Sequence, residues 1–454
     1  MSIKRCGLLL VILLISFAAN SAAVQAEYLL AEQPYLHNSI ITAADVLDTG
    51  ADQIIAGLGS EVKIYDQEQV LETISGFSGV VTAVAAGDLT GDFRPEILIG
   101  TDKGSYYIYQ KVQGKWQQVF EQRYLWTPVV YLEVCDITGN GWGDVIVRTA
   151  RGEAFVYLSW DGKLELFWRS QPNAAVKYIQ AADLTGSGRD DVVFTHNSGY
   201  VGVLSWQEGQ FELVWQNFPW GTIDSLVVAE LQSGQLPEIM VVTGQNIVYT
   251  WRWNGETIAT QRHFPYELEG NVTKIVPGLG LVNISTASGI TSYSIGASSL
   301  SVRSVYPLSG VRDIVMVNDT MLIEETSGRY YTLYDVDPEQ IRIFVNNKAT
   351  NKPIGLQVYS GKIYLDVDGL ASALGLIRFG TKRIFLIKGL DYFVIDPEEG
   401  AVLWRNTPLP FADQILTQDG KTYIPISLIS LMGYDVDFDY STSELRITKS
   451  WGWW

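Results

Sequence analysis

A short acidic motif recurs through the first half of the chain and is the clearest candidate for chemistry. It reads Asp, an apolar residue, Thr, Gly, then Asp, Asn or Ser, with a second acidic residue four positions later. Its best copies begin at Asp88, Asp136 and Asp183, and weaker ones at Asp45 and Glu230. Oxygen atoms on alternate residues of a tight turn could surround a hard cation such as calcium. An Asp before Thr-Gly can equally hydrogen-bond to its own turn without metal.

The spacing of this motif predicts the elements that position it. Its acidic residues stand 43 to 48 positions apart, and nine residues after each one an apolar strand begins. A Gly turn such as Asp161-Gly162 follows, which is typical of a tight hairpin. Each unit therefore predicts four strands, and a period near 45 residues with four strands per unit indicates a β-propeller blade.

Two fainter units, residues 271–302 and 309–334, continue the repeat without the acidic turn. We expect a mainly β fold, a seven-bladed β-propeller over residues 35–336, followed by a C-terminal α+β domain. Six or eight blades, and a β-solenoid or an array of sandwiches, are the alternatives.

The acidic motif resembles the FG-GAP or VCBS repeats of integrin α-like propellers over about residues 40–245. The resemblance implies calcium bound through oxygens at loop positions 1, 3, 5 and 9. The implied ligands are Asp88, Thr90, Asp92 and Glu96 in one loop, Asp136, Thr138, Asn140 and Asp144 in the next, and Asp183, Thr185, Ser187 and Asp191 in the third. Thr occupies position 3 where the family usually has Asp or Asn, which weakens the implied metal site.

Residues 340–449 contain a second, shorter repeat. Gly361 and Gly420 each open a short strand that is followed by an apolar helix ending at Gly, a favoured helix stop. This segment resembles the stalk domain called copper amine oxidase N-terminal-like. The resemblance implies an envelope-associated module that has neither copper nor quinone, and the three histidines, His37, His196 and His263, lie far apart in the sequence.

The two ends of the chain carry further signals. Residues 1–26 read as a secretory signal peptide, because Lys4 and Arg5 precede an apolar run that is too short to span a bilayer. An uncleaved anchor is the alternative, and no second apolar stretch of spanning length follows. Three tryptophans in residues 450–454 could bind sugar rings or an interface, or pack on their own domain.

Composition narrows the function classes. The formal net charge of −18 repels phosphate backbones, so we expect no nucleic-acid partner. The sequence lacks the motifs of nucleophilic, zinc-dependent and phosphate-binding enzymes. We therefore expect a secreted, cell-envelope-associated binding or adhesion protein that recognises a glycan or a surface protein and is not an amine oxidase. A carbohydrate-active enzyme on the propeller face, which would need two paired carboxylates, and a purely structural envelope component are the alternatives.

Overall fold

The structure is a computed structural model of the full chain. It describes residues 28–449 except for these positions: 67, 124, 161–162, 172–174, 233, 265–271, 279–280, 287–288, 296–299, 307, 309, 319, 336–337, 351–353, 389–390, 406, 410–412, 419 and 440–441. The predicted signal peptide at 1–26 and the Trp-rich tail at 450–454 lie outside the described residues.

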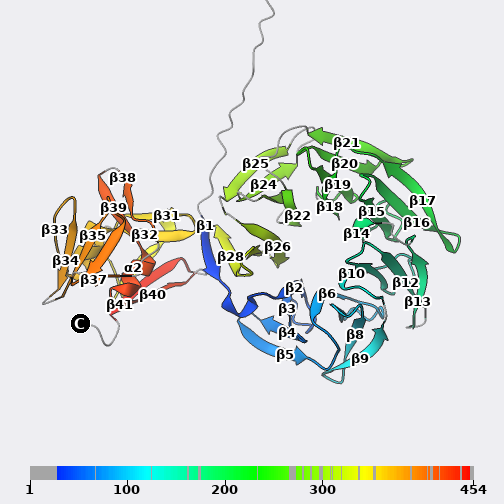
Figure 1. Ribbon diagram of the computed structural model, residues 1–454, viewed down its shortest axis with the longest axis horizontal. Coiled ribbons are helices and arrows are strands. Elements are labelled where there is room, and N and C mark those ends of the chain that lie inside the picture. The colour runs from blue at the N-terminus through cyan, green and yellow to red at the C-terminus, as the bar shows by residue number, and fades with distance from the viewer. Residues whose placement is uncertain are drawn as a thin grey trace, which may run out of the picture.

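The described strands up to Asp335 form seven four-stranded antiparallel sheets, which Figure 1 shows arranged in a ring. In chain order the first three sheets are β2 (Ile40–Ala44), β3 (Gln53–Leu58), β4 (Glu61–Asp66) and β5 (Gln69–Ile74); β6 (Val81–Gly87), β7 (Glu96–Thr101), β8 (Tyr106–Val112) and β9 (Lys115–Gln122); and β10 (Val129–Cys135), β11 (Asp144–Thr149), β12 (Ala154–Trp160) and β13 (Lys163–Arg169). The next three are β14 (Val176–Ala182), β15 (Asp191–His196), β16 (Val201–Gln207) and β17 (Gln210–Asn217); β18 (Ile223–Ala229), β19 (Glu238–Thr243), β20 (Val248–Trp253) and β21 (Ile258–Phe264); and β22 (Val272–Gly278), β23 (Leu281–Thr286), β24 (Gly289–Ile295) and β25 (Leu300–Tyr306). The last sheet combines β26 (Val311–Val317), β27 (Thr320–Glu325) and β28 (Tyr330–Asp335) with β1 (Tyr28–Glu32) from the start of the chain.

The ring is closed through the first strand of each blade. Strand β2 contacts β6, β6 contacts β10, and the series continues through β14, β18, β22 and β26 back to β2. The predicted mainly β fold with a β-propeller is therefore confirmed. Strand β1 lies before residue 35, where the repeat begins, and is joined to β2 by the 3-10 turn Pro34–Leu36.

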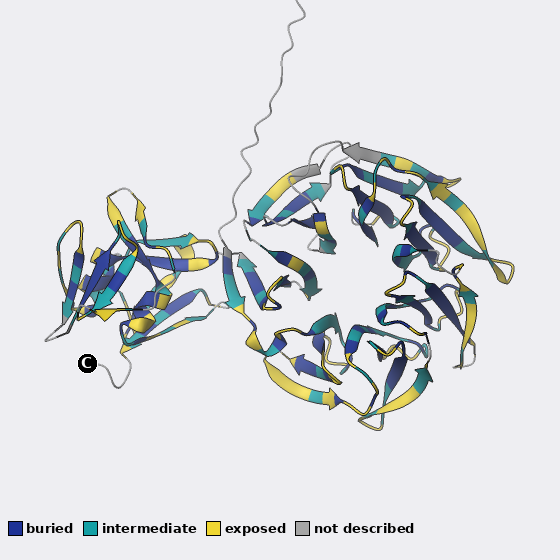
Figure 2. Cartoon of the chain, in the orientation of Figure 1, coloured by how far each residue is buried: buried dark blue, intermediate teal, exposed yellow. Residues whose placement is uncertain are grey.

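Burial across a blade follows its radial order (Figure 2). The second strands β7 and β19 are buried at every position. Each lies between two strands of its own sheet, and neighbouring blades cover its faces. Their apolar side chains form the cores between blades, such as the cluster that joins Leu98 and Ile108 to Val145 and Val147. The fourth strands are exposed at the rim, as in β13 and β17.

A register shift interrupts the outermost strand pair in six of the seven blades. Such bulges twist an exposed edge and hinder its pairing with another chain. The seventh blade differs, because β1 pairs with β28 without a shift. The outer edge of β1 meets the C-terminal domain instead of solvent.

The C-terminal domain is α+β. Its sheets comprise β29 (Arg342–Val345), β30 (Lys348–Ala349), β40 (Tyr434–Asp439) and β41 (Glu444–Lys449); β31 (Leu356–Tyr359), β32 (Lys362–Asp366), β38 (Leu416–Gln418) and β39 (Lys421–Pro425); and β33 (Ile377–Phe379), β34 (Ile384–Lys388), β35 (Asp391–Asp396), β36 (Ala401–Trp404) and β37 (Thr407–Pro408). A 3-10 turn, Pro338–Gln340, precedes them. Helix α1 (Val367–Leu374) follows β32, and helix α2 (Ile426–Leu431) follows β39. These strand–helix pairs are the two copies of the short repeat, and β32 pairs with β39 around one shared core.

Candidate functional site

The acidic turns lie between the first and second strands of consecutive blades. In the turn after β6, one carboxylate oxygen of Asp88, Oδ1, accepts hydrogen bonds from the N–H groups of Thr90, Gly91 and Asp92 at 3.1, 2.8 and 3.3 Å. The other, Oδ2, accepts from Phe93 N–H at 2.6 Å. Four backbone donors of one short segment therefore converge on a single side chain. The carboxylate holds its own turn in shape.

The same arrangement repeats in the next two blades. Asp136 accepts from the N–H groups of Gly139, Asn140 and Gly141 at 2.8, 3.2 and 2.8 Å. Asp183 accepts from Ser187 N–H at 2.9 Å and Gly188 N–H at 2.7 Å. The first-position Asp of every predicted loop thus faces its own backbone.

The ninth-position carboxylates are buried at the base of the turns. Glu96 Oε2 accepts from Leu89 N–H at 2.8 Å. Asp144 accepts from Ile137, Thr138 and Ser159 N–H groups at 2.9, 3.2 and 2.7 Å, and its side chain is fully buried. Burial raises the pKa of Glu96 to about 7 and that of Asp144 to about 6, and it also raises the pKa of Asp191. These carboxylates join the turn to the strands beneath it.

The intermediate positions are polar turn residues. Asp92 Oδ1 accepts from Arg94 N–H at 2.9 Å, and Asn140 Oδ1 accepts from Trp142 N–H at 2.8 Å. Ser187 Oγ accepts from Arg189 N–H at 3.3 Å, and Thr185 is half-buried in the same turn. The hydroxyl oxygens of Thr90 and Thr138 are buried without a hydrogen-bond partner. Across the described residues, no three His, Cys, Asp or Glu side chains gather as a metal site would require.

The first loop shows that the turn forms without the implied ligand set. Asp45 accepts from Thr49 N–H at 2.8 Å and from Gly50 N–H at 2.6 Å, as its counterparts do. At the ninth position the neutral Gln53 accepts from Leu47 N–H at 3.0 Å. Hydrogen bonding within the turn is therefore sufficient for this shape, and calcium binding by the other loops stays a prediction.

We expect Asp136→Ala to lower the free energy of unfolding by about 1–3 kcal/mol in calcium-free buffer, because three backbone donors lose their acceptor. Urea denaturation of the Asp136→Ala variant and of the unchanged chain, each with and without calcium, measures the effect. A loss that arises only when calcium is present would show instead that Asp136 acts through the metal.

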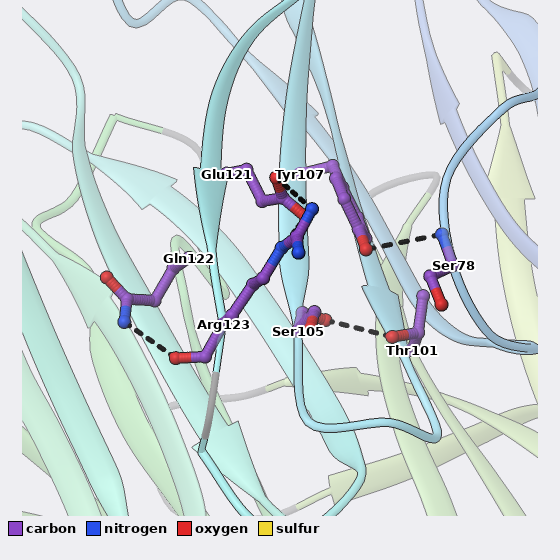
Figure 3. Close-up of polar contacts among 7 residues, drawn as sticks. All are labelled: Ser78, Thr101, Ser105, Tyr107, Glu121, Gln122 and Arg123. Atoms are coloured by element: carbon purple, nitrogen blue, oxygen red, sulfur yellow. Dashed lines mark hydrogen bonds and ion pairs between the residues drawn. The ribbon is translucent and has the colours of Figure 1, made fainter.

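The opposite face of the ring carries the loops that join one blade to the next. Figure 3 shows the loop between blades one and two, where Ser78 N–H donates to the hydroxyl of Tyr107 at 3.2 Å. Below it, Thr101 Oγ1 donates to the carbonyl of Ser105 at 3.3 Å. Arg123 pairs with Glu121 at 2.5 and 2.9 Å, and this hydrogen-bonded pair lowers the pKa of Glu121. The Ser78–Tyr107 contact thus ties the loop to the blade that comes after it in the chain.

Two tryptophans project from equivalent positions of these loops. Trp126 and Trp220 each stand three residues before the first strand of a blade, where blade two has Ser78. Trp126 is 81% exposed and Trp220 is 67% exposed. The preceding residues, Leu125 and Pro219, are buried and anchor the loops. The alternation of a buried anchor and an exposed neighbour directs both indoles outward.

A group of aromatic rings begins two residues before Trp220 in the same loop. Phe218 is 65% exposed, and its ring lies 5.6 Å from that of Tyr200, which stacks on His196 at 5.1 Å. The backbone N–H of Trp220 donates to the hydroxyl of Tyr249 at 3.1 Å, and this contact is the counterpart of the one between Ser78 and Tyr107. We call Trp126, Tyr200, Phe218 and Trp220 the aromatic face. Large exposed aromatic groups on ordered loops are typical of protein interfaces.

Sequence reasoning missed this face. Other tryptophans, such as Trp168 and Trp215, lie on repeated strand positions and pack between blades. The signal that separates Trp126 and Trp220 is their place between repeats rather than on a repeated strand position. Of the histidines, His37 is exposed and His196 contacts Ser198 Oγ, whereas the side chain of His263 lies outside the described residues.

Comparison with known proteins supports the propeller fold. The family model of the KICSTOR complex protein kaptin matches residues 63–161, well under half of the chain. The crystal structure of BBS1N in complex with ARL6DN has a TM-score of 0.50 at 12% identity and covers 69% of this chain and 98% of that chain. The Myceliophteria thermophila Cps50 (Swd1) β-propeller domain has a TM-score of 0.50 at 15% identity, covering 66% and 98%. A chain of the Mitotic Checkpoint Complex has a TM-score of 0.50 at 10% identity, covering 68% and 95%.

No curated protein matches the chain. At these identities the structural likeness establishes the fold alone. The resemblances to FG-GAP repeats and to the amine oxidase stalk domain stay predictions. Within the described part of the chain, no helix is long and apolar enough to span a membrane.

Proposed function

We propose that this chain is a non-enzymatic binding scaffold that holds a protein partner on its aromatic face. The observation that carries this proposal is the pair of equivalent, outward-directed side chains, Trp126 and Trp220, on anchored loops of one face. Burying such rings against a partner removes a large apolar area from water, and Trp is enriched among residues that dominate binding energy.

The similar propellers support a protein partner. BBS1N was crystallised in complex with ARL6DN, and another similar chain belongs to the Mitotic Checkpoint Complex. A propeller presents several loops from a rigid ring, so its loops bind without a large ordering cost. Together with the predicted signal peptide and stalk-like domain, the aromatic face favours a surface protein of the cell envelope as the partner. The acidic turns then serve as supports of the other face, with calcium as a proposed additional ligand.

The test is partner capture by the mature chain. Immobilised protein is exposed to an envelope extract, and the captured protein is identified and its affinity measured. We expect Trp126→Ala combined with Trp220→Ala to weaken this affinity at least tenfold, about 1.4 kcal/mol, because two interface anchors are lost.

The matched control is Phe93→Ala. Phe93 is 94% exposed but lies in an acidic turn on the opposite face, so its removal should leave the affinity unchanged. Equal loss in the control and the double variant would contradict the proposal. Binding of purified envelope polysaccharide, abolished by the same two substitutions, would assign the face to a glycan instead, and turnover of that polysaccharide would indicate an enzyme.

A further inference from the structure

Strand β1 completes the propeller from outside the repeat. Its five residues pair with β28 over the whole strand, from Tyr28 opposite Asp335 to Glu32 opposite Tyr331. A ring of blades is stable only when its last sheet is complete, because the open edge of β28 would otherwise face solvent. The first described strand therefore joins the start of the chain to the end of the propeller (Figure 1).

The other edge of β1 belongs to the C-terminal domain. The N–H of Leu30 donates to the carbonyl of Gly361, in the turn between β31 and β32, at 3.0 Å. Strand β1 also contacts both of these strands. In the view of Figure 1, β1 lies between β28 and the C-terminal domain. One short strand thus has a different domain on each side.

Neighbouring side chains of β1 likewise pack against different domains. Leu29 is 3% exposed and belongs to the core of the C-terminal domain, with Ile363 and Leu365. Leu30 is half-buried and packs against the core of the last blades, which contains Val311 and Leu333. Because neighbouring residues of a strand point to opposite faces, one leucine is placed in each core.

We propose that β1 couples closure of the propeller ring to docking of the C-terminal domain, so that releasing this strand loosens both together. The inference goes beyond the proposed function, since it concerns neither the aromatic face nor its partner. Strand β1 stays in place through its contacts with β28 on one edge and with the C-terminal domain on the other. A change that weakens the contacts on one edge therefore also weakens those on the other. The two domains therefore behave as one unit at this seam, although their sequences are separate repeats.

A residue on the propeller side offers a reciprocal test. Gln33 follows β1 directly and is 9% exposed. Its Nε2 donates to the hydroxyl of Thr332 at 2.9 Å and to the carbonyl of Ala31 at 3.2 Å, and its N–H donates to the carbonyl of Tyr330 at 2.7 Å. Gln33→Ala removes the side-chain bond to Thr332 that fastens the end of β1 to β28, together with the local bond to Ala31, and leaves the Leu29 side unchanged.

The experiment is hydrogen–deuterium exchange on the mature full-length chain. We expect Leu29→Asp and Gln33→Ala each to speed exchange at least tenfold in both β28 and β31–β32. The matched control is Leu71→Asp on the rim strand β5, where the side chain is 38% exposed; exchange in β28 and β31–β32 should stay unchanged.

Two outcomes would overturn the coupling. Faster exchange confined to β31–β32 in Leu29→Asp, or confined to β28 in Gln33→Ala, would show that ring closure and docking are independent. If Leu29→Asp does not fold, Leu29→Ala replaces it with the same expectation. Partner capture by the aromatic face is a separate readout, so a failure of that proposal leaves this one standing.

Discussion

Replacing Asp144 with alanine is expected to lower the free energy of unfolding by about 3–5 kcal/mol. The side chain is fully buried. It accepts hydrogen bonds from three backbone N–H groups in two separate segments, the acidic turn and strand β12 at Ser159. Leaving a buried donor without its acceptor costs about 1–3 kcal/mol, and three are orphaned together. The loss should be large both with and without calcium, because the donors belong to the protein backbone.

Urea denaturation at pH 7 measures this effect. Glu165→Ala in the same blade is the matched control, since Glu165 is exposed on the rim strand β13 and its loss should change stability by less than about 0.5 kcal/mol. Asp144→Asn tests the mechanism further, because the amide keeps one acceptor but turns a donor toward the N–H groups. A loss below about 1 kcal/mol for Asp144→Ala would mean that the turn does not depend on this carboxylate.

The second large effect concerns pH. Glu133 lies on β10 and reaches the neighbouring blade, where both of its oxygens accept from Ala181 N–H at 3.2 Å. The hydroxyl of Tyr131 donates to the same carboxylate at 3.0 Å. Burial, with a smaller contribution from the nearby Asp190, raises the pKa of Glu133 to about 8. The folded chain therefore binds this proton between about pH 4.5 and pH 8, where the unfolded chain has released it.

This difference in bound protons sets the direction in which stability changes with pH. Because the folded state holds more protons than the unfolded state in this window, the free energy of unfolding falls as pH rises from about 5 to about 8.5. Glu96 and Asp144, with pKa values raised to about 7 and about 6, act in the same direction. We expect a total decrease on the order of a few kcal/mol.

Glu133→Gln isolates the contribution of this carboxylate. The next blade already uses glutamine at the equivalent position, where Gln180 accepts from Val228 N–H at 2.8 Å, so the neutral side chain fits the contact. The variant should match the unchanged chain near pH 5 and exceed its stability by roughly 1–2 kcal/mol at pH 8.5. Urea denaturation from pH 5 to pH 8.5, with Glu165→Gln as the control, measures this difference. If the free energy of unfolding of Glu133→Gln falls with pH as steeply as that of the unchanged chain, the pH dependence comes from a group other than Glu133.

Much of the propeller could be predicted from the sequence, for a local reason. Each of the first six blades is a contiguous run of four strands whose turns are specified by nearby residues, such as Asp136 and the glycines that follow it. The role of the acidic motif was less accessible. The same Asp and Thr pattern fits a metal loop or a self-bonded turn, and only the directions of the backbone N–H groups distinguish them.

The sequence alone therefore determined the repeat, the strand order within the first six blades and the strand–helix repeat of the second domain, because these depend on contacts between residues close along the chain. Tertiary structure decided which side chains face solvent and which strands meet across long distances. Trp126 and Trp168 are the same residue type, yet one projects from a loop and the other packs between blades. Strand β1 carries no repeat signal, since its partners, β28 and the turn at Gly361, lie some 300 residues away and come together only when the ring closes.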